Sequence, residues 1–275
     1  MIQYYRDKLP LPENPESLCK NFTHYEFTTE ELGFPTYQDL YKSVKEIESE
    51  IGTQGFMING KESEGYGGFS LVYNPDYKGD NTSIYHQTLG DPKLITAASQ
   101  HENKEARSEI YEGKDSYYDT YGFTHRMPII EKHFGSLFNK IHGAIMRSRV
   151  SYLHSKSFRF DNPKQNWHID EYAWQMIRII IPVKTSDNFV IRMNGDDGLG
   201  NSIDNLEFSP ELGKVYMWNN RIPHQMAPID IKDDPRIYII IGFSPWFNFE
   251  NNQYVPNENW GYPINTIVEN QLFIQ

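Results

Sequence analysis

The chain has 275 residues, of which 38% are hydrophobic, 15% aromatic and 23% charged, and its mean hydropathy is −0.66. This length suits one large domain or two small ones, and the aromatic content excludes a disordered chain. The formal net charge of −11 disfavours nucleic acid as a partner, because an acidic surface repels phosphate groups. The single cysteine, Cys19, excludes an intramolecular disulfide framework and a cysteine-based zinc site.

The amino-terminal residues contain no apolar stretch of the kind found in a signal peptide, and the longest apolar runs are only as long as a strand. We therefore expect a soluble, cytoplasmic protein that does not associate with a membrane.

The segment 36–52 has the clearest helical pattern in the chain. Thr36, followed three residues later by Asp39, resembles a capping box with Asp in place of the usual Glu. Apolar residues then recur at helical spacing up to Gly52, which is typical of a helix end: Leu40, Val44, Ile47 and Ile51.

A second helix is predicted over residues 128–145, with Pro128 near its start. One apolar stripe runs along it and has to be buried against the core: Ile130, Phe134, Leu137, Phe138, Ile141 and Ile145. His133 and His142 are nine residues apart and do not share a turn, so we interpret them as structural or surface residues.

After Ile145 the apolar pattern changes to alternation, which predicts strands. Apolar residues Val150, Tyr152, Phe158 and Phe160 alternate with the polar residues Ser151, Ser155, Ser157 and Arg159. Further strands are predicted at 174–183, 188–193, 214–218 and 236–243, and a short one at 69–73. The segment 194–201 is predicted to be a long turn, because it lacks the full calcium-binding loop pattern.

Several short strands with no helical pattern between them indicate an antiparallel sandwich or barrel of the jelly-roll kind. The predicted fold class is mainly β with flanking helices and a double-stranded β-helix core. We expect a single domain with this core over 146–250. A helical and loop-rich part, 1–145, buttresses the core, and 251–275 forms a carboxy-terminal extension.

The segment Asn166-Trp167-His168-Ile169-Asp170-Glu171 contains the first candidate metal ligands. In an extended segment, residues i and i+2 point to the same side, so His168 and Asp170 project together. His224 follows much later in the chain, far enough for several short strands to cross a barrel in between. Two histidines and one carboxylate are the ligands of many non-haem Fe(II) sites and leave positions open for cosubstrate and oxygen.

Arg236 begins a strongly apolar strand, and an inward-pointing arginine there needs an acidic partner. A dicarboxylic cosubstrate satisfies it through two parallel hydrogen bonds. Arg178 lies within another apolar strand and likewise needs an acidic partner if its side chain points inward. The alternative for both is a solvent-facing side chain or an ion pair with Asp or Glu.

The block from His168 to Gly242, little more than a quarter of the chain, resembles the Fe(II)- and 2-oxoglutarate-dependent oxygenases, particularly the aspartyl/asparaginyl β-hydroxylase-like branch. The resemblance lies in four segments in a fixed order: His168-Ile169-Asp170, Arg178-Ile179-Ile180-Ile181-Pro182, Leu212 to Trp218 before His224, and Asp234-Pro235-Arg236-Ile237-Tyr238.

This resemblance implies that His168, Asp170 and His224 bind Fe(II) and that Arg236 holds the distal carboxylate of 2-oxoglutarate. It implies that Arg178 assists at the carboxylate near the metal. It also assigns an assisting role to Ser157, with Ser155 a near-equal candidate. The implied enzyme is a dioxygenase that hydroxylates an unactivated C–H bond of an amino acid, peptide side chain or small metabolite. It uses O2, with ascorbate as reductant, and releases succinate and CO2.

Two other readings of the residues remain. Another metal-dependent enzyme of the cupin type shares the barrel, but it usually has three histidines and a glutamate. The second alternative is a non-catalytic jelly-roll module, structural or glycan-binding. Such a module would not explain why His168, Asp170, His224 and Arg236 occur in this order. Tyr172 and Trp174 follow the first ligands and are candidates either for the substrate pocket or for the barrel core.

Overall fold

The computed structural model describes residues 9–58, 61–73, 124–155, 167–232, 235–270 and 273. The helical segments are η1 (Pro15–Cys19), α2 (Tyr37–Ile51), α5 (Pro128–Phe138) and α6 (Ile264–Asn270). The strands are β1 (His24–Thr28), β2 (Gln54–Ile58), β3 (Lys61–Ser70), β4 (Ala144–Ile145), β5 (Arg149–Leu153), β6 (Ile177–Lys184), β7 (Phe189–Asp196), β8 (Ser202–Phe208), β9 (Lys214–Trp218), β10 (His224–Pro228), β11 (Arg236–Ser244), β12 (Phe247–Glu250) and β13 (Gln253–Pro256).

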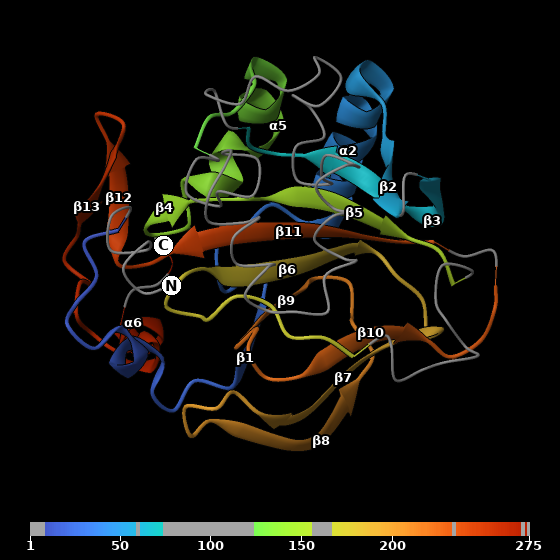
Figure 1. Ribbon diagram of the computed structural model, residues 1–275. Helices are drawn as coiled ribbons and strands as arrows, with labels where there is room; N and C mark the ends of the chain where they lie inside the picture. The colour runs from blue at the N-terminus through green and yellow to red at the C-terminus, as the bar shows by residue number, and fades with distance from the viewer. Residues whose placement is uncertain are drawn as a thin grey trace.

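Two antiparallel sheets face each other and form the expected double-stranded β-helix core of the jelly-roll kind (Figure 1). The large sheet has the strand order β1-β9-β6-β11-β5-β3-β2, with β4 paired to β11. The small sheet has the order β10-β7-β8, and β12 and β13 form a separate hairpin. Helices α2 and α5 cover the face of the large sheet that points away from the small sheet. The predicted fold class is confirmed.

The central strand β11 is buried along its whole length, and alternation divides its side chains between two apolar cores. Ile237, Ile239 and Ile241 pack toward α2 and α5 in the larger core. Tyr238 and Ile240 pack toward the small sheet in the second core. Because Arg236 has the same parity as these two residues, the fold places its side chain between the sheets.

Helix α2 agrees with the sequence prediction. The hydroxyl of Thr36 accepts a hydrogen bond from the backbone N–H of Asp39, as in the predicted cap. The helix ends before Gly52, whose φ of 74° suits a residue without a side chain.

The prediction of a helix over 128–145 was wrong in its second half. Helix α5 ends at Phe138, and Ile145 lies in β4, opposite Phe243 of β11. The reason is a close approach of two backbones: a Cβ at Gly143 would lie 2.2 Å from the carbonyl oxygen of Ser244. The chain therefore leaves the helix to pair with the sheet: Ala144 and Ile145 form β4, and Ile141 forms a bridge with Phe273.

Several strand boundaries also differ from the prediction. Residues 173–175 form a turn, so the strand predicted to begin at Trp174 begins at Ile177. His224 begins a strand of its own, β10, and β8 follows the predicted long turn. Within the segment 1–145, β1 pairs with β9 and β3 pairs with β5, so this part extends the large sheet in addition to covering it with helices.

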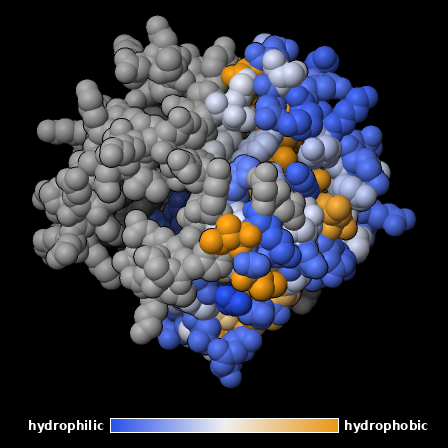
Figure 2. All heavy atoms as spheres, turned by 90° about the vertical axis from the view of Figure 1, so that its right-hand side faces the viewer, coloured by the Kyte–Doolittle hydropathy of each residue, from blue (hydrophilic) through white to orange (hydrophobic). Residues whose placement is uncertain are grey.

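None of the described helices is long and apolar enough to cross a lipid bilayer. The described part of the face shown in Figure 2 is mainly hydrophilic, with a small group of apolar side chains near its centre.

Candidate metal centre

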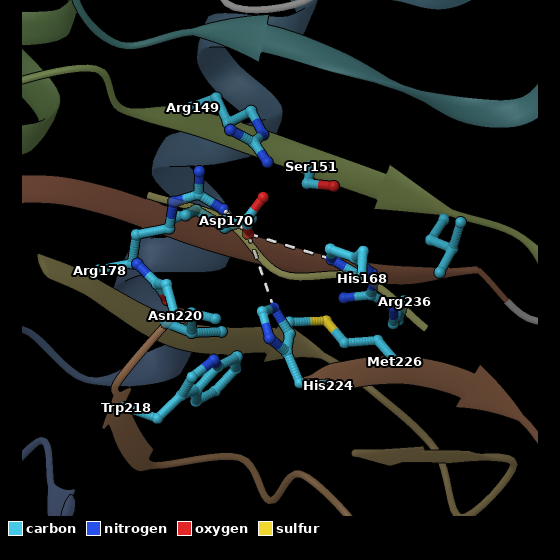
Figure 3. Close-up of a pocket in the computed structure, with 13 residues that line it drawn as sticks. Arg149, Ser151, His168, Asp170, Arg178, Trp218, Asn220, His224, Met226 and Arg236 are labelled. Carbon is cyan, nitrogen blue, oxygen red and sulfur yellow. Dashed lines mark hydrogen bonds and ion pairs between the residues drawn. The ribbon is translucent and has the colours of Figure 1, made fainter. Parts of the chain in front are cut away.

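A cavity of about 260 Å³ lies between the two sheets. Four groups of side chains face it (Figure 3): three arginines, the three candidate metal ligands, two buried side chains from the end of β9, and a set of mostly apolar residues. The described lining residues are Arg149, Ser151, Leu153, His168, Asp170, Arg178, Ile180, Trp218, Asn220, His224, Met226, Arg236 and Ile240.

The two histidines are held by a backbone bridge between distant segments. The N–H of His168 donates to the carbonyl of His224 and the reverse bond is also formed, both at 3.0 Å. The N–H of Asp170 donates to the carbonyl of Asn220 at 2.8 Å, which extends the contact. The ring centroids of the histidines are 4.4 Å apart.

His168, Asp170 and His224 converge as the sequence predicted. One potential ligand atom from each lies within 4.8 Å of the other two. The Asp170 Oδ2 atom is 3.6 Å from Nε2 of His224 and 4.0 Å from Nε2 of His168. The His224 side chain is 3% accessible to solvent and the His168 side chain 51%. The three candidate ligands therefore lie where the cavity opens to solvent.

The tautomer of His224 follows from its neighbour. Its Nδ1 lies 2.9 Å from the carbonyl oxygen of Ile222, and a carbonyl can only accept, so Nδ1 carries the proton. In the neutral ring Nε2 then keeps a free lone pair on the side of Asp170. A hydrogen bond of this kind is how proteins orient histidine ligands toward a metal.

Arg178 forms ion pairs with Asp170 and with Glu171, the latter at 2.6 Å. Burial favours the neutral form of Asp170, but the Arg178 guanidinium, together with the neighbouring His168 and His224, outweighs it and holds the pKa of Asp170 well below its ordinary value. Asp170 is therefore a carboxylate near neutral pH, as a metal ligand must be. The ion-pair alternative for Arg178 is observed, and its role toward a cosubstrate stays a prediction.

Arg236 is buried, with 4% of its surface accessible, and its side chain lines the cavity. The guanidinium carbon lies 4.2 Å from the ring centroid of Tyr238 and 5.9 Å from that of Phe189, which fixes the side chain by cation–π contact. Figure 3 shows Arg236 on the side of His168 and Met226, and Arg178 on the other side of the triad.

Other predicted site residues have different positions. Ser157 lies outside the described residues. The hydroxyl of Ser155 donates to the carbonyl of Lys232 at 2.6 Å and accepts from its N–H at 2.8 Å, so it anchors the segment between β10 and β11. Tyr172 and Trp174 stack on each other with centroids 5.7 Å apart and pack with the larger core. Neither is among the described residues that line the cavity, and a pocket role for them stays a prediction.

Among the lining residues that sequence reasoning missed, three carry side-chain N–H donors: Arg149, Trp218 and Asn220. The alternation in β5 carried a signal for Arg149, because it has the same parity as Ser151 and Leu153, and that side of the strand faces the cavity and not bulk solvent. Trp218, the last residue of β9, and Asn220, just after it, likewise lie two residues apart. The sequence pattern predicted the strand β9 but not which of its faces the second sheet encloses.

The donor set fits a divalent transition metal. Two imidazole nitrogens and one carboxylate oxygen face the same space, and such mixed ligands suit Fe(II) with further positions open. A closed structural zinc site normally has four protein ligands, whereas the described residues supply three.

No protein-family model and no curated protein match this chain. Similar solved structures include an oxidoreductase of the 2OG-Fe(II) oxygenase family from Burkholderia pseudomallei, with 16% identity and a TM-score of 0.29, covering 46% of this chain and 55% of that one. A non-haem α-ketoglutarate-dependent carbocyclase from nogalamycin biosynthesis, SnoK, has 9% identity and a TM-score of 0.40, covering 88% and 87%.

A Pseudomonas putida prolyl-4-hydroxylase has 11% identity and a TM-score of 0.39, covering 84% of this chain and 98% of that one. The present chain spans little more than half the length of the Burkholderia protein. These similarities are weak in both sequence and structure, and we therefore infer the function from the residues of the cavity.

Proposed function

We propose that this protein is an Fe(II)- and 2-oxoglutarate-dependent dioxygenase that hydroxylates an unactivated C–H bond of a small substrate. The observation that carries the proposal is the position of Arg236, buried in the same cavity as the His168–Asp170–His224 group. A metal-binding triad alone fits many enzymes, whereas a buried arginine in the same cavity suits a cosubstrate that bears a second carboxylate.

In this proposal His168, Asp170 and His224 hold Fe(II), and Arg236 binds the distal carboxylate of 2-oxoglutarate. The bound metal and cosubstrate supply the oxidising chemistry, with O2 consumed and succinate and CO2 released. The described protein groups bind and orient: His224 keeps Nε2 toward the metal position through its Nδ1–H bond, and Arg178 holds Asp170 as a carboxylate.

The apolar lining limits access of water to the reacting groups. Ile180, Met226 and Ile240 form this part of the cavity wall. The finer assignment to the aspartyl/asparaginyl β-hydroxylase-like branch rests on the sequence motifs alone.

The test is succinate release by the purified protein in the presence of Fe(II), 2-oxoglutarate, O2 and ascorbate. We expect slow release without a primary substrate, dependence on both Fe(II) and 2-oxoglutarate, and faster release with the right substrate, which gains one oxygen atom detectable by mass spectrometry. Asp170→Ala serves as the inactive control. No succinate above this control, across a broad panel of amino acids and peptides, contradicts the proposal and favours a binding module.

A further inference from the structure

The cavity wall is rich in arginine. The described lining residues include three guanidinium groups and one carboxylate, Asp170. Arg178 is paired with Asp170 and with Glu171, and the other two arginines of the wall are Arg149 and Arg236. Guanidinium groups on a cavity wall suit an anionic ligand.

Arg236 and Arg178 lie at two separate ends of the cavity. Along β11, Arg236 stands opposite Leu153 of β5, whereas Gly242 stands opposite Arg178 of β6. The stretch of strand between these two positions is about 20 Å long at the usual rise per residue. With 2-oxoglutarate directed toward Arg236, the end near Arg178 remains for a second molecule.

Two buried N–H donors face that second end. Trp218 stands directly opposite Arg178 in the β9–β6 pair, and Asn220 follows two residues later (Figure 3). Both residues line the cavity, and their exposed fractions are 2% and 1%. Neither Nε1 of Trp218 nor Nδ2 of Asn220 has an acceptor among the described residues. Buried donors without an acceptor cost free energy, so a pair of them in a cavity wall indicates a ligand that supplies the oxygen atoms.

We propose that the primary substrate is a small molecule with a free carboxylate, and that Trp218 Nε1–H and Asn220 Nδ2–H donate to that carboxylate. The guanidinium group of Arg149, in β5, adds a positive charge to the wall of the same cavity. This inference rests on the proposed function, and it selects among the possible substrates. A free amino acid or a comparable carboxylic acid fits, whereas a side chain within a peptide has no carboxylate of its own unless it is acidic or terminal. The small cavity volume of about 260 Å³ points the same way.

The experiment measures binding rather than turnover. Wild type is loaded with Mn(II) and 2-oxoglutarate, and the probes are the common L-amino acids, each compared with its carboxamide. Thermal stabilisation is recorded first, followed by calorimetric titration of each pair that responds. We expect at least one amino acid to bind about 10-fold more tightly than its amide, or better, since hydrogen bonds to a charged group are stronger than those to a neutral one.

Two variants assign the donors. Asn220→Asp keeps the shape but places a carboxylate against the ligand, so we expect binding of the amino acid to weaken by about 10-fold or more. Trp218→Phe removes the indole N–H together with part of the buried ring, and should weaken this binding several-fold. Asn252→Asp, in the exposed turn between β12 and β13, adds the same charge elsewhere, and Trp260→Phe removes an indole N–H that donates to the carbonyl of Pro10. Both controls should bind like wild type.

The outcomes separate this inference from the proposed function. If wild type binds Mn(II) and 2-oxoglutarate but treats every acid and amide alike, the carboxylate inference alone fails. It also fails if folded Trp218→Phe and Asn220→Asp both bind the acid like wild type. If wild type does not bind 2-oxoglutarate, the proposed function fails, and this inference fails with it.

Discussion

His168 and His224 are joined by two backbone hydrogen bonds of 3.0 Å, each N–H donating to the carbonyl of the other residue, although the two histidines lie far apart in the sequence. The bridge sets the separation of the two rings through the backbone, which does not depend on a bound ion. The sheets therefore preorganise the metal position, and loss of one ligand side chain should leave the fold in place.

The first prediction follows from this preorganisation. His168→Ala should abolish the thermal stabilisation that Mn(II) or Fe(II) gives to the wild type. A ligand that binds only the folded state adds about 2.7 kcal/mol at a concentration 100-fold above its Kd. Melting curves with and without metal measure the effect. His142→Ala is the matched control, because His142 pairs with Glu258 and does not line the metal cavity. Equal stabilisation of His168→Ala and wild type would show that the metal binds elsewhere.

The second prediction concerns Asp170 and its neighbour Glu171, which share Arg178. Asp170→Ala should remove metal binding and activity but retain the fold, because Arg178 keeps Glu171 as a partner. The double variant Asp170→Ala/Glu171→Ala leaves Arg178 without either carboxylate. Its loss of unfolding free energy should exceed the sum of the two single losses by about 0.5–3 kcal/mol, the usual coupling within one ion-pair network. Urea unfolding of the four proteins measures this, and additive losses would contradict it.

The sequence predicted which side chains converge in this cavity better than it predicted the cavity walls. His168 and Asp170 were predictable as a pair because residues i and i+2 of an extended segment share a side, and Arg236 because an arginine in an apolar strand needs an acceptor. Trp218 and Asn220 were not predicted as cavity residues. Their exposure to the cavity depends on how the small sheet lies over β9, which is a tertiary property.

The same distinction explains the fold. Helix α2 was predicted with both of its ends because Thr36, Asp39 and Gly52 act locally. The end of α5 was missed because the chain near Gly143 leaves the helix to meet the backbone of β11, a contact between segments that are distant in the sequence. Strand β1 was missed for a similar reason, since it is held by pairing with β9.

The third prediction compares two glycines. A Cβ at Gly242 in β11 would lie 2.4 Å from the carbonyl oxygen of Arg147 and 2.5 Å from Sδ of Met176, so Gly242→Ala should cost about 1–3 kcal/mol of unfolding free energy. A Cβ at Gly135 in α5 meets the end of the flexible Glu131 side chain. Gly135→Ala should therefore stabilise by about 0.5–1 kcal/mol through helix propensity. Denaturant unfolding distinguishes the two, and equal effects would contradict the packing of β11.

The fourth prediction is a dependence on alkaline pH. Burial raises the pKa of Tyr216 to about 12, and its hydroxyl oxygen accepts from the N–H of Glu211 at 3.0 Å. In the unfolded chain this tyrosine ionises at about pH 10. The contribution of Tyr216 to the free energy of unfolding is therefore complete below about pH 10 and is lost as the pH rises toward 12. The stability advantage of wild type over Tyr216→Phe should shrink across this interval. Parallel stability curves for the two proteins between pH 9 and 12 would contradict the prediction.

The fifth prediction separates an oxygenase from other metal-binding barrels. Truncation of Arg236 should leave the distal carboxylate of 2-oxoglutarate buried without its partner, a loss of about 2–5 kcal/mol. This corresponds to binding weaker by roughly 30-fold to several-thousand-fold. Arg236→Lys should lie between wild type and Arg236→Ala, since lysine keeps the charge but not the planar pair of donors.

The role of Arg236 in binding 2-oxoglutarate is tested by a pair of titrations, first with Mn(II) and then with 2-oxoglutarate, on wild type and Arg236→Ala, with circular dichroism to confirm that both are folded. We expect both proteins to bind Mn(II) alike and only wild type to bind 2-oxoglutarate tightly. A folded Arg236→Ala protein that binds 2-oxoglutarate as wild type does, or a wild type that binds Mn(II) but no 2-oxoglutarate, would contradict it.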